Sequence, residues 1–190
     1  MYWMLRKMPT RDNDARIHGQ PETIEKLGLN FGKGLEVPGK FKEIVITRKK
    51  SHPGNLTDNL LAYGATGFVF NKKIRNILKK LNVNNIDYYK AVLDDEITGE
   101  STRDYQIANI IGVVKCIDME KSEFRLDVNN RIESIKKLVL DQDELWNTDL
   151  PIFRIAEYFP IVLVHNILKE AFEKEGVTGL GYMKPEMLVL

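Results

Sequence analysis

The sequence predicts an α+β fold in which an antiparallel or mixed sheet carries a few helices. Three observations support this prediction. Most of the β-prone runs follow one another along the chain without a helix between them. Only a few segments have the apolar spacing of an amphipathic helix. One strand-helix-strand pattern occurs twice, at about residues 67–89 and 161–183, with an offset of 94 residues. We call these segments the first copy and the second copy.

The N-terminal portion contains two β-prone runs, which predict strands over residues 2–8 and 41–47. The polar, charged residues 9–19 between them predict a mobile loop. A short helix is expected over residues 21–27, because proline favours the first turn of a helix and Gly28 can end it. The glycine-rich chain that follows, and residues 49–55, predict irregular structure and turns.

The first copy contains the clearest helix signal. Asn71 is expected to cap this helix, because its side chain can accept a hydrogen bond from an otherwise unpaired amide. Asn82 tolerates the left-handed backbone that often ends a helix. The spacing i, i+3, i+4, i+7 predicts an apolar stripe that faces a core. Its members are Ile74, Ile77, Leu78 and Leu81.

The second copy repeats this pattern with different residues. His165 takes the position of the cap, and Gly176 takes the position of the helix stop. The apolar stripe is formed by Leu168, Ala171 and Phe172. The two copies therefore predict two similar strand-helix-strand units.

The chain between and beside the copies is rich in strand signals. Residues 105–119 are dense in β-branched side chains and predict one long strand. Residues 123–128 alternate strictly, as a half-buried strand does. Residues 131–140 fit a strand or a helix, and the strand is favoured. Two short strands are expected over residues 150–155 and 159–164.

Length and composition predict one soluble domain over residues 1–190, with an N-terminal portion at 1–57. The 43% hydrophobic and 29% charged residues are those of an ordinary globular protein. Cys116 is the one cysteine, so no internal disulfide can form, which suits a reducing cytoplasm. No membrane association is expected, because no apolar run approaches the roughly 20 residues of a spanning helix. The N-terminus lacks the pattern of a signal peptide.

Charge is distributed unevenly along the chain. Residues 1–90 hold 17 basic and 8 acidic side chains, whereas residues 91–190 hold 11 and 19. This polarity fits two surfaces for different partners, or two halves that neutralise each other across one fold. The second interpretation is favoured.

No residue pattern predicts a catalytic site, a metal site or a cofactor. None of the three histidines, His18, His52 and His165, has a second ligand at the spacing that zinc sites use. Cys116 lies in an apolar run, where a thiol usually acts as a small hydrophobe. The Gly-Lys-Gly run at residues 32–34 lacks the other features of a phosphate-binding loop.

Two surface features suggest partners. The helix over residues 72–80 is rich in lysine, but the acidic residues of the matching second helix make nucleic-acid binding the weaker interpretation. Residues 140–149 combine acidic side chains with a tryptophan, which is a workable surface for docking a basic protein. The alternative, an ordinary loop whose tryptophan packs inward, is favoured by the sequence alone. The residues of this candidate surface are Asp141, Asp143, Glu144 and Trp146.

Several motifs resemble a known family when they are taken in order. An aspartate, Asp58, precedes GFVFN at residues 67–71. Then come CIDMEKS at 116–122, PIFR at 151–154, IVLVH at 161–165 and GVTGLGY at 176–182. This order resembles the eleventh immunity-protein family of bacterial polymorphic toxin systems, formerly a domain of unknown function. The resemblance is clearest over residues 58–181. One departure is the helix-start position, often serine in that family, which is Asn71 and His165 here.

The resemblance implies a cytoplasmic protein that binds and blocks a cognate protein toxin, with no cofactor and no catalytic residues. It also implies that the protein is not an enzyme. Two alternatives stay open. One is a small cytoplasmic enzyme of unknown reaction, with a site assembled around Asp118, Ser122 and His165. The other is a nucleic-acid-binding adaptor that uses the lysine-rich helix.

Overall fold

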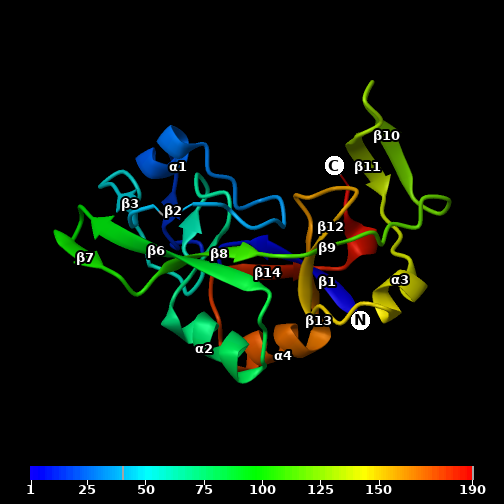
Figure 1. The fold of residues 1–190 in the computed structure, drawn as a ribbon. Helices are drawn as coiled ribbons and strands as arrows, with labels where there is room; N and C mark the ends of the chain where they lie inside the picture. The colour runs from blue at the N-terminus through cyan, green and yellow to red at the C-terminus, as the bar shows by residue number, and fades with distance from the viewer. Residues whose placement is uncertain (40, 190) are drawn as a thin grey trace.

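The computed structural model describes residues 1–39 and 41–189, and two five-stranded sheets form its centre (Figure 1). The first sheet has the order β14 (Leu180–Met183), β1 (Tyr2–Lys7), β13 (Val162–His165), β12 (Ile152–Ile155) and β9 (Val113–Val114). The second has the order β3 (Ile44–Arg48), β6 (Ile86–Asp95), β8 (Gln106–Ile110) and β5 (Phe68–Phe70), with β7 (Glu100–Thr102) paired to β6.

Two small sheets and several short helices complete the fold. The two-stranded sheets pair β2 (Arg16–Ile17) with β4 (Leu61–Ala62), and β10 (Glu123–Leu126) with β11 (Ile132–Lys137). The helices are α1 (Glu22–Leu27), α2 (Lys72–Lys80), α3 (Gln142–Trp146), α4 (Asn166–Lys174) and the 3₁₀ turn Pro185–Met187. Most strand pairs are antiparallel, but β3 with β6, β9 with β12 and β2 with β4 are parallel. The predicted α+β fold with mixed sheets is confirmed.

Each copy of the repeat forms a β-α-β unit whose two strands are separated by a third strand. In the first copy, β5 and β6 both pair antiparallel with β8, which lies between them. In the second copy, β13 and β14 both pair antiparallel with β1. The third strand of the first copy, β8, follows that copy along the chain. The third strand of the second copy, β1, precedes that copy by more than 150 residues. The second copy is therefore completed by the N-terminal strand.

The two units also share one strand register. Ala108 of β8 lies opposite both Phe68 and Tyr88. Leu5 of β1 lies opposite Val162 and Tyr182, which are 94 residues beyond Phe68 and Tyr88. The repetition found in the sequence is thus a repetition of backbone pairing.

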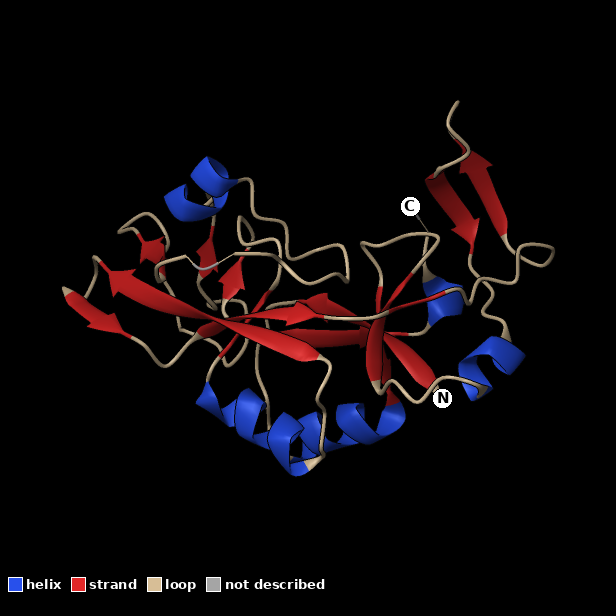
Figure 2. Ribbon diagram, in the orientation of Figure 1, coloured by secondary structure: helices blue, strands red, loops and turns tan. Residues whose placement is uncertain are grey.

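The helices α2 and α4 pack side by side against one face of the two sheets, as the blue helices in Figure 2 show. Their apolar stripes bury Ile74, Ile77, Leu78, Leu168 and Phe172 in one cluster with residues of both sheets. This first cluster joins the two copies. A second cluster covers the other face of β1, β12 and β13, and a third packs against the second sheet.

The predicted helix ends are confirmed. One member of the predicted apolar stripe is not buried. Asn71 caps α2 by accepting a hydrogen bond from the amide of Ile74, at 3.2 Å. Asn82 and Gly176 have left-handed backbones, with φ of 55° and 60°. Leu81, however, is 37% exposed. It is the C-cap residue, just beyond the last residue of α2.

One prediction about a loop and two predictions about strands need correction. Residues 9–19 contain β2, and Asp14 anchors this segment because its carboxylate accepts the amides of Thr10 and Arg11. The long strand over 105–119 is broken into β8 and β9 at Gly112, whose φ is 109°. The alternation at 123–128 gives the strand β10, but this hairpin strand is mostly exposed. Strand β11 confirms the choice of strand for residues 131–140.

Candidate functional site

The acidic segment predicted as a contact surface folds as α3. Asp141 caps this helix, and its carboxylate accepts hydrogen bonds from the amides of Asp143, at 2.9 Å, and Glu144, at 3.2 Å. Leu145 is buried in the second cluster and holds the helix against the protein. The carboxylate of Asp141 therefore has a structural role as a helix cap, and not only the role of a surface charge.

The other three residues of the surface are exposed together. Asp143 and Glu144 lie in the first turn of α3, and Trp146 ends it with 89% of its area exposed. Burial of an exposed indole by a partner stabilises the complex, and tryptophan is enriched among the residues that dominate binding energy. The structure thus brings Asp143, Glu144 and Trp146 to one exposed helix.

A hollow of about 290 Å³ lies next to Trp146. Its walls include Tyr2 from β1 and His165 from the end of β13, besides residues of α3. The Tyr2 hydroxyl donates to the carbonyl of Leu150, at 3.0 Å, and so ties the N-terminal strand to the chain beyond α3. Nothing in the local pattern of residues 140–149 signals Tyr2 or His165, because both reach this place through strand pairing in the first sheet.

The electrostatic environment around α3 is negative. Burial raises the pKa of the Cys116 thiol to about 12, and the carboxylates of Glu157, Glu144 and Asp141 act in the same direction. Burial also raises the pKa of the Tyr2 hydroxyl, with further contributions from Cys116 and Asp149. Burial is the largest cause of both shifts, and the carboxylates of Asp141, Glu144, Asp149 and Glu157 act in the same direction. Carboxylates gathered around an exposed helix favour a basic partner.

The β10–β11 hairpin projects at the same end of the molecule as α3 (Figure 1). Its inward residues Ile132 and Ile135 belong to the second cluster, which also contains Leu145 of α3. The tip leaves Val128 99% exposed, and Leu126 is 41% exposed. The hairpin and α3 therefore present exposed apolar side chains from two elements that share one core.

The three residues considered for an enzymatic site are each engaged in structural contacts. Asp118 accepts a hydrogen bond from Lys121 Nζ at 2.6 Å, and Ser122 Oγ exchanges hydrogen bonds with the backbone of Val139. His165 Nδ1 accepts the amide of Ile167 at the start of α4. Over residues 1–39 and 41–189, no hydrogen bond joins any two of these three side chains.

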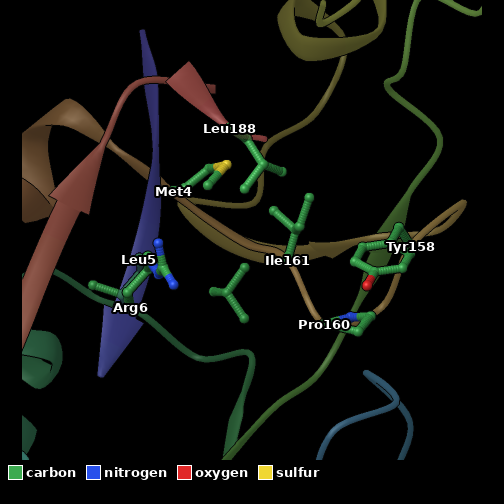
Figure 3. Close-up of a pocket in the computed structure, with 8 residues that line it drawn as sticks. Met4, Leu5, Arg6, Tyr158, Pro160, Ile161 and Leu188 are labelled. Carbon is green, nitrogen blue, oxygen red and sulfur yellow. The ribbon is translucent and has the colours of Figure 1, made fainter. Parts of the chain in front are cut away.

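An apolar pocket of about 170 Å³ lies between β1, the start of β13 and the C-terminal segment (Figure 3). Met4, Ile161 and Leu188 line it, and its polar side chains are Arg6 and Tyr158. A pocket with this lining offers no carboxylate or imidazole for proton transfer. Within the described parts of the chain, no three histidine, cysteine or acidic residues are grouped so that they could hold a metal ion.

The lysine-rich helix α2 does not present a continuous basic surface. Lys73 forms an ion pair with Asp58 at 3.1 Å, and Arg75 donates to the carbonyl of Asp104 at 2.8 Å. The neighbouring α4 carries Glu170 and Glu173 on its surface. No helix among the described residues is both long and apolar enough to cross a membrane.

The fold and this surface define an α+β protein whose exposed chemistry, a tryptophan among carboxylates, is of the kind found on proteins that bind other proteins. The family model of the immunity protein family Imm11 matches residues 3–186, so the chain belongs to this family. The match includes the N-terminal strand that completes the second copy. No match was found among curated proteins. Membership in an immunity family suggests a binding role and a toxin as the general class of partner.

Proposed function

We propose that this protein binds a cognate protein toxin of a bacterial polymorphic toxin system and neutralises it by direct contact, without catalysis. Membership in the Imm11 family supports a toxin as the partner. Asp118 and Ser122 make contacts within one turn and with Val139, and His165 caps α4, so these side chains give no support to the enzymatic alternative. The ion pair of Lys73 with Asp58 and the acidic residues of the neighbouring α4 likewise weaken the nucleic-acid alternative.

We further propose that α3 forms part of the contact surface. The observation that carries this proposal is the 89% exposure of Trp146 on a helix whose first turn holds Asp143 and Glu144. A stable protein complex buries about 800 Å² on each partner, and a few aromatic anchors supply much of its free energy. Carboxylates around the anchor would accelerate association with a basic toxin surface.

The encounter is proposed to take place in the bacterial cytoplasm. Cys116 is buried, and its raised pKa keeps the thiol protonated and unreactive. The protein needs no disulfide for stability, which suits a reducing compartment. Fractionation of cells that express the protein, followed by immunoblotting, tests this location.

The proposed function is tested by co-expression with the toxin domain encoded beside this protein. The two chains are expected to co-purify, and the protein is expected to restore the growth of cells that express the toxin. Toxin-inhibited growth that is not restored, together with no complex in gel filtration, would contradict the proposal.

The contribution of α3 is tested by Asp143→Asn, Glu144→Gln and Trp146→Ala in one variant. This variant is expected to bind the toxin at least about 30-fold more weakly, since a buried tryptophan anchor alone is worth about 2 kcal/mol. Calorimetry measures the affinity, and circular dichroism checks that the fold is intact. The matched control is Glu96→Gln, Ile97→Ala and Glu100→Gln, which removes two carboxylates and an exposed apolar side chain at the β6–β7 turn. Equal toxin affinity of the two variants would exclude α3 from the interface.

A further inference from the structure

We propose that a hollow beside α2 binds a small phosphorylated molecule, independently of the toxin-binding surface at α3. The two helices lie in different parts of the molecule, α2 at the lower left and α3 at the right of Figure 1. The hollow has a volume of about 590 Å³, within the range of small-molecule sites. Its polar lining includes Arg75, Asn76, Lys79, Asn84, Tyr88 and Gln106.

The cations at this hollow have no anionic partner in the protein. Arg75 uses one terminal nitrogen on the carbonyl of Asp104, and its Nε atom is buried without a hydrogen-bond partner. Lys90 lies opposite Gln106, a residue of the hollow's lining, in the β6–β8 pairing. Among the described residues, no carboxylate lies within 4.0 Å of the charged nitrogens of Arg75, Lys79 or Lys90. Cations without an anionic partner favour the binding of an anion at this place.

The second copy shows the equivalent place with its charges compensated. Lys169, which matches Arg75 at the offset of 94, forms an ion pair with Glu173 at 2.7 Å. Its Nζ also lies 4.8 Å from the ring centre of Trp3 and 5.6 Å from that of Tyr182. Lys184, which matches Lys90, lies 6.0 Å from the same Trp3 ring. An acid and an indole thus neutralise and cover the cations there.

The first copy lacks both of these compensating groups. Lys79 takes the position of Glu173. Lys79 lies four residues beyond Arg75, and Glu173 lies four residues beyond Lys169. Gln106 takes the position of Trp3. Gln106 lies opposite Phe70 in the first copy, and Trp3 lies opposite Val164, the residue that matches Phe70, in the second. One scaffold therefore carries a filled site with a paired lysine and covered cations in one copy, and an open site with unpaired cations in the other. This difference is the observation that points to a ligand.

The lining selects a compact oxyanion attached to a small polar molecule. Arginine and lysine together suit a phosphate group, since guanidinium can form two parallel hydrogen bonds with its oxygens. The amides of Asn76, Asn84 and Gln106 can form hydrogen bonds with a polar remainder, and Tyr88, 37% exposed, offers a ring for a flat group to stack on. A long nucleic acid fits less well, because α4, which packs beside α2, carries acidic residues.

The test uses inorganic pyrophosphate as the probe and follows backbone amides by NMR. Saturable shifts at residues 75–84 and 106 are expected in the full chain. The variant Lys79→Glu with Gln106→Trp installs the two groups of the second copy and is expected to bind at least about tenfold more weakly, because charge-assisted hydrogen bonds are lost. The matched control is Lys80→Glu, the same charge change on α2 outside the hollow, and its affinity is expected to stay within about threefold.

Several outcomes would overturn this inference. The first is the absence of shifts at these residues up to about 10 mM pyrophosphate, far above a useful affinity for a phosphate site. The second is an equal loss of binding in Lys80→Glu, which would indicate diffuse attraction. The third is salt-sensitive binding of a single-stranded RNA that is tighter than the binding of pyrophosphate and that Lys80→Glu weakens as much as the double variant does. This result would indicate a nucleic-acid surface. If the double variant fails to fold by circular dichroism, Lys79→Gln replaces it, with a loss of at least about threefold expected.

Discussion

Asp58 is the residue that connects the two copies of the repeat. Its Oδ2 accepts hydrogen bonds from the amide and the hydroxyl of Thr178, in the turn after α4, and from Lys73 Nζ in α2. Its Oδ1 accepts a hydrogen bond from Asn71, the cap of α2, at 2.8 Å. One carboxylate thus holds the start of one helix against the turn that follows the other.

The network also determines how Asp58 titrates. Burial raises the pKa of this carboxyl, but hydrogen bonds from Thr178, Asn71 and Lys73 outweigh burial, so the pKa is lowered. A lowered pKa means that the folded state favours the charged form. Its contribution to stability is therefore complete above the unfolded pKa, near 4, and is lost as pH falls through the folded pKa.

The variant Asp58→Ala is expected to lose about 2–3 kcal/mol of unfolding free energy at pH 7, because it leaves Lys73, Asn71 and Thr178 without their acceptor. The loss should shrink as pH falls through the lowered folded-state pKa of Asp58, because the wild-type carboxylate is then protonated as well. Urea unfolding at pH 7 and along an acid titration measures the difference. Asp12→Ala, at an exposed aspartate, is the control and should change stability by less than about 0.5 kcal/mol. A loss for Asp58→Ala no larger than that of the control would contradict the assigned role.

At the scale of the elements, the two repeat helices begin with different caps. Asn71 holds the first turn of α2 with an amide oxygen, which does not titrate between pH 3 and 9. His165 holds α4 with Nδ1, 3.4 Å from the amide of Ile167, and this nitrogen accepts only while it is unprotonated. Burial lowers the pKa of His165, and the nearby terminal ammonium group lowers it further against the opposing effect of Glu170.

The variant His165→Asn is expected to make the start of α4 insensitive to pH. The pKa of His165 is lower in the folded state, so its cap contributes fully above the unfolded pKa, near 6.5, and is lost as pH falls through the folded pKa. At pH 5 the variant should therefore exceed the wild type in unfolding free energy by up to about 1 kcal/mol, the value of a typical cap. At pH 8 the two should be nearly equal. Urea unfolding at the two pH values tests this, and a difference independent of pH would contradict it.

The elements were predictable where the signal was local. The caps, the helix stops and the buried stripes follow from the spacing of a few neighbouring residues, and they are confirmed at Asn71, Asn82 and Gly176. The break at Gly112 was missed because it depends on distant partners. Its amide donates to the carbonyl of Gly34, and its own carbonyl accepts the amide of Arg154. The short helix α3 was missed because it has too few residues for a periodic pattern.

At the scale of the whole molecule, the missing information concerned the strands that complete the repeat. The sequence showed two strand-helix-strand copies, but β8 and β1 lie outside them and share no visible pattern. The candidate surface was found in part, since the acidic residues and Trp146 adjoin one another in the chain. Its neighbours Tyr2 and His165 reach it only through the order of the first sheet. The open hollow at α2 depends on which residues of β8 and β1 lie opposite each copy, and no local pattern in the sequence shows this pairing.

These connections lead us to infer that residues 1–190 form one domain. The N-terminal strand β1 is the middle strand of the second copy, and the first cluster contains residues of both copies and both helices. A perturbation of β1 should therefore weaken the second sheet as well. Two separate domains would respond independently.

The variant Leu5→Ala tests this inference. Leu5 is 4% exposed in the first cluster, so its truncation should cost about 2–4 kcal/mol of unfolding free energy. Because one cooperative unit unfolds as a whole, the slowest amide protons of β6 and β8 should exchange faster by the same factor as those of β1. Native-state hydrogen exchange measures this, with Met8→Ala, a half-exposed side chain just beyond β1, as the control. If exchange accelerates in β1, β13 and β14 while β6 and β8 keep their wild-type rates, the two sheets are separate folding units, and the second copy is a domain of its own.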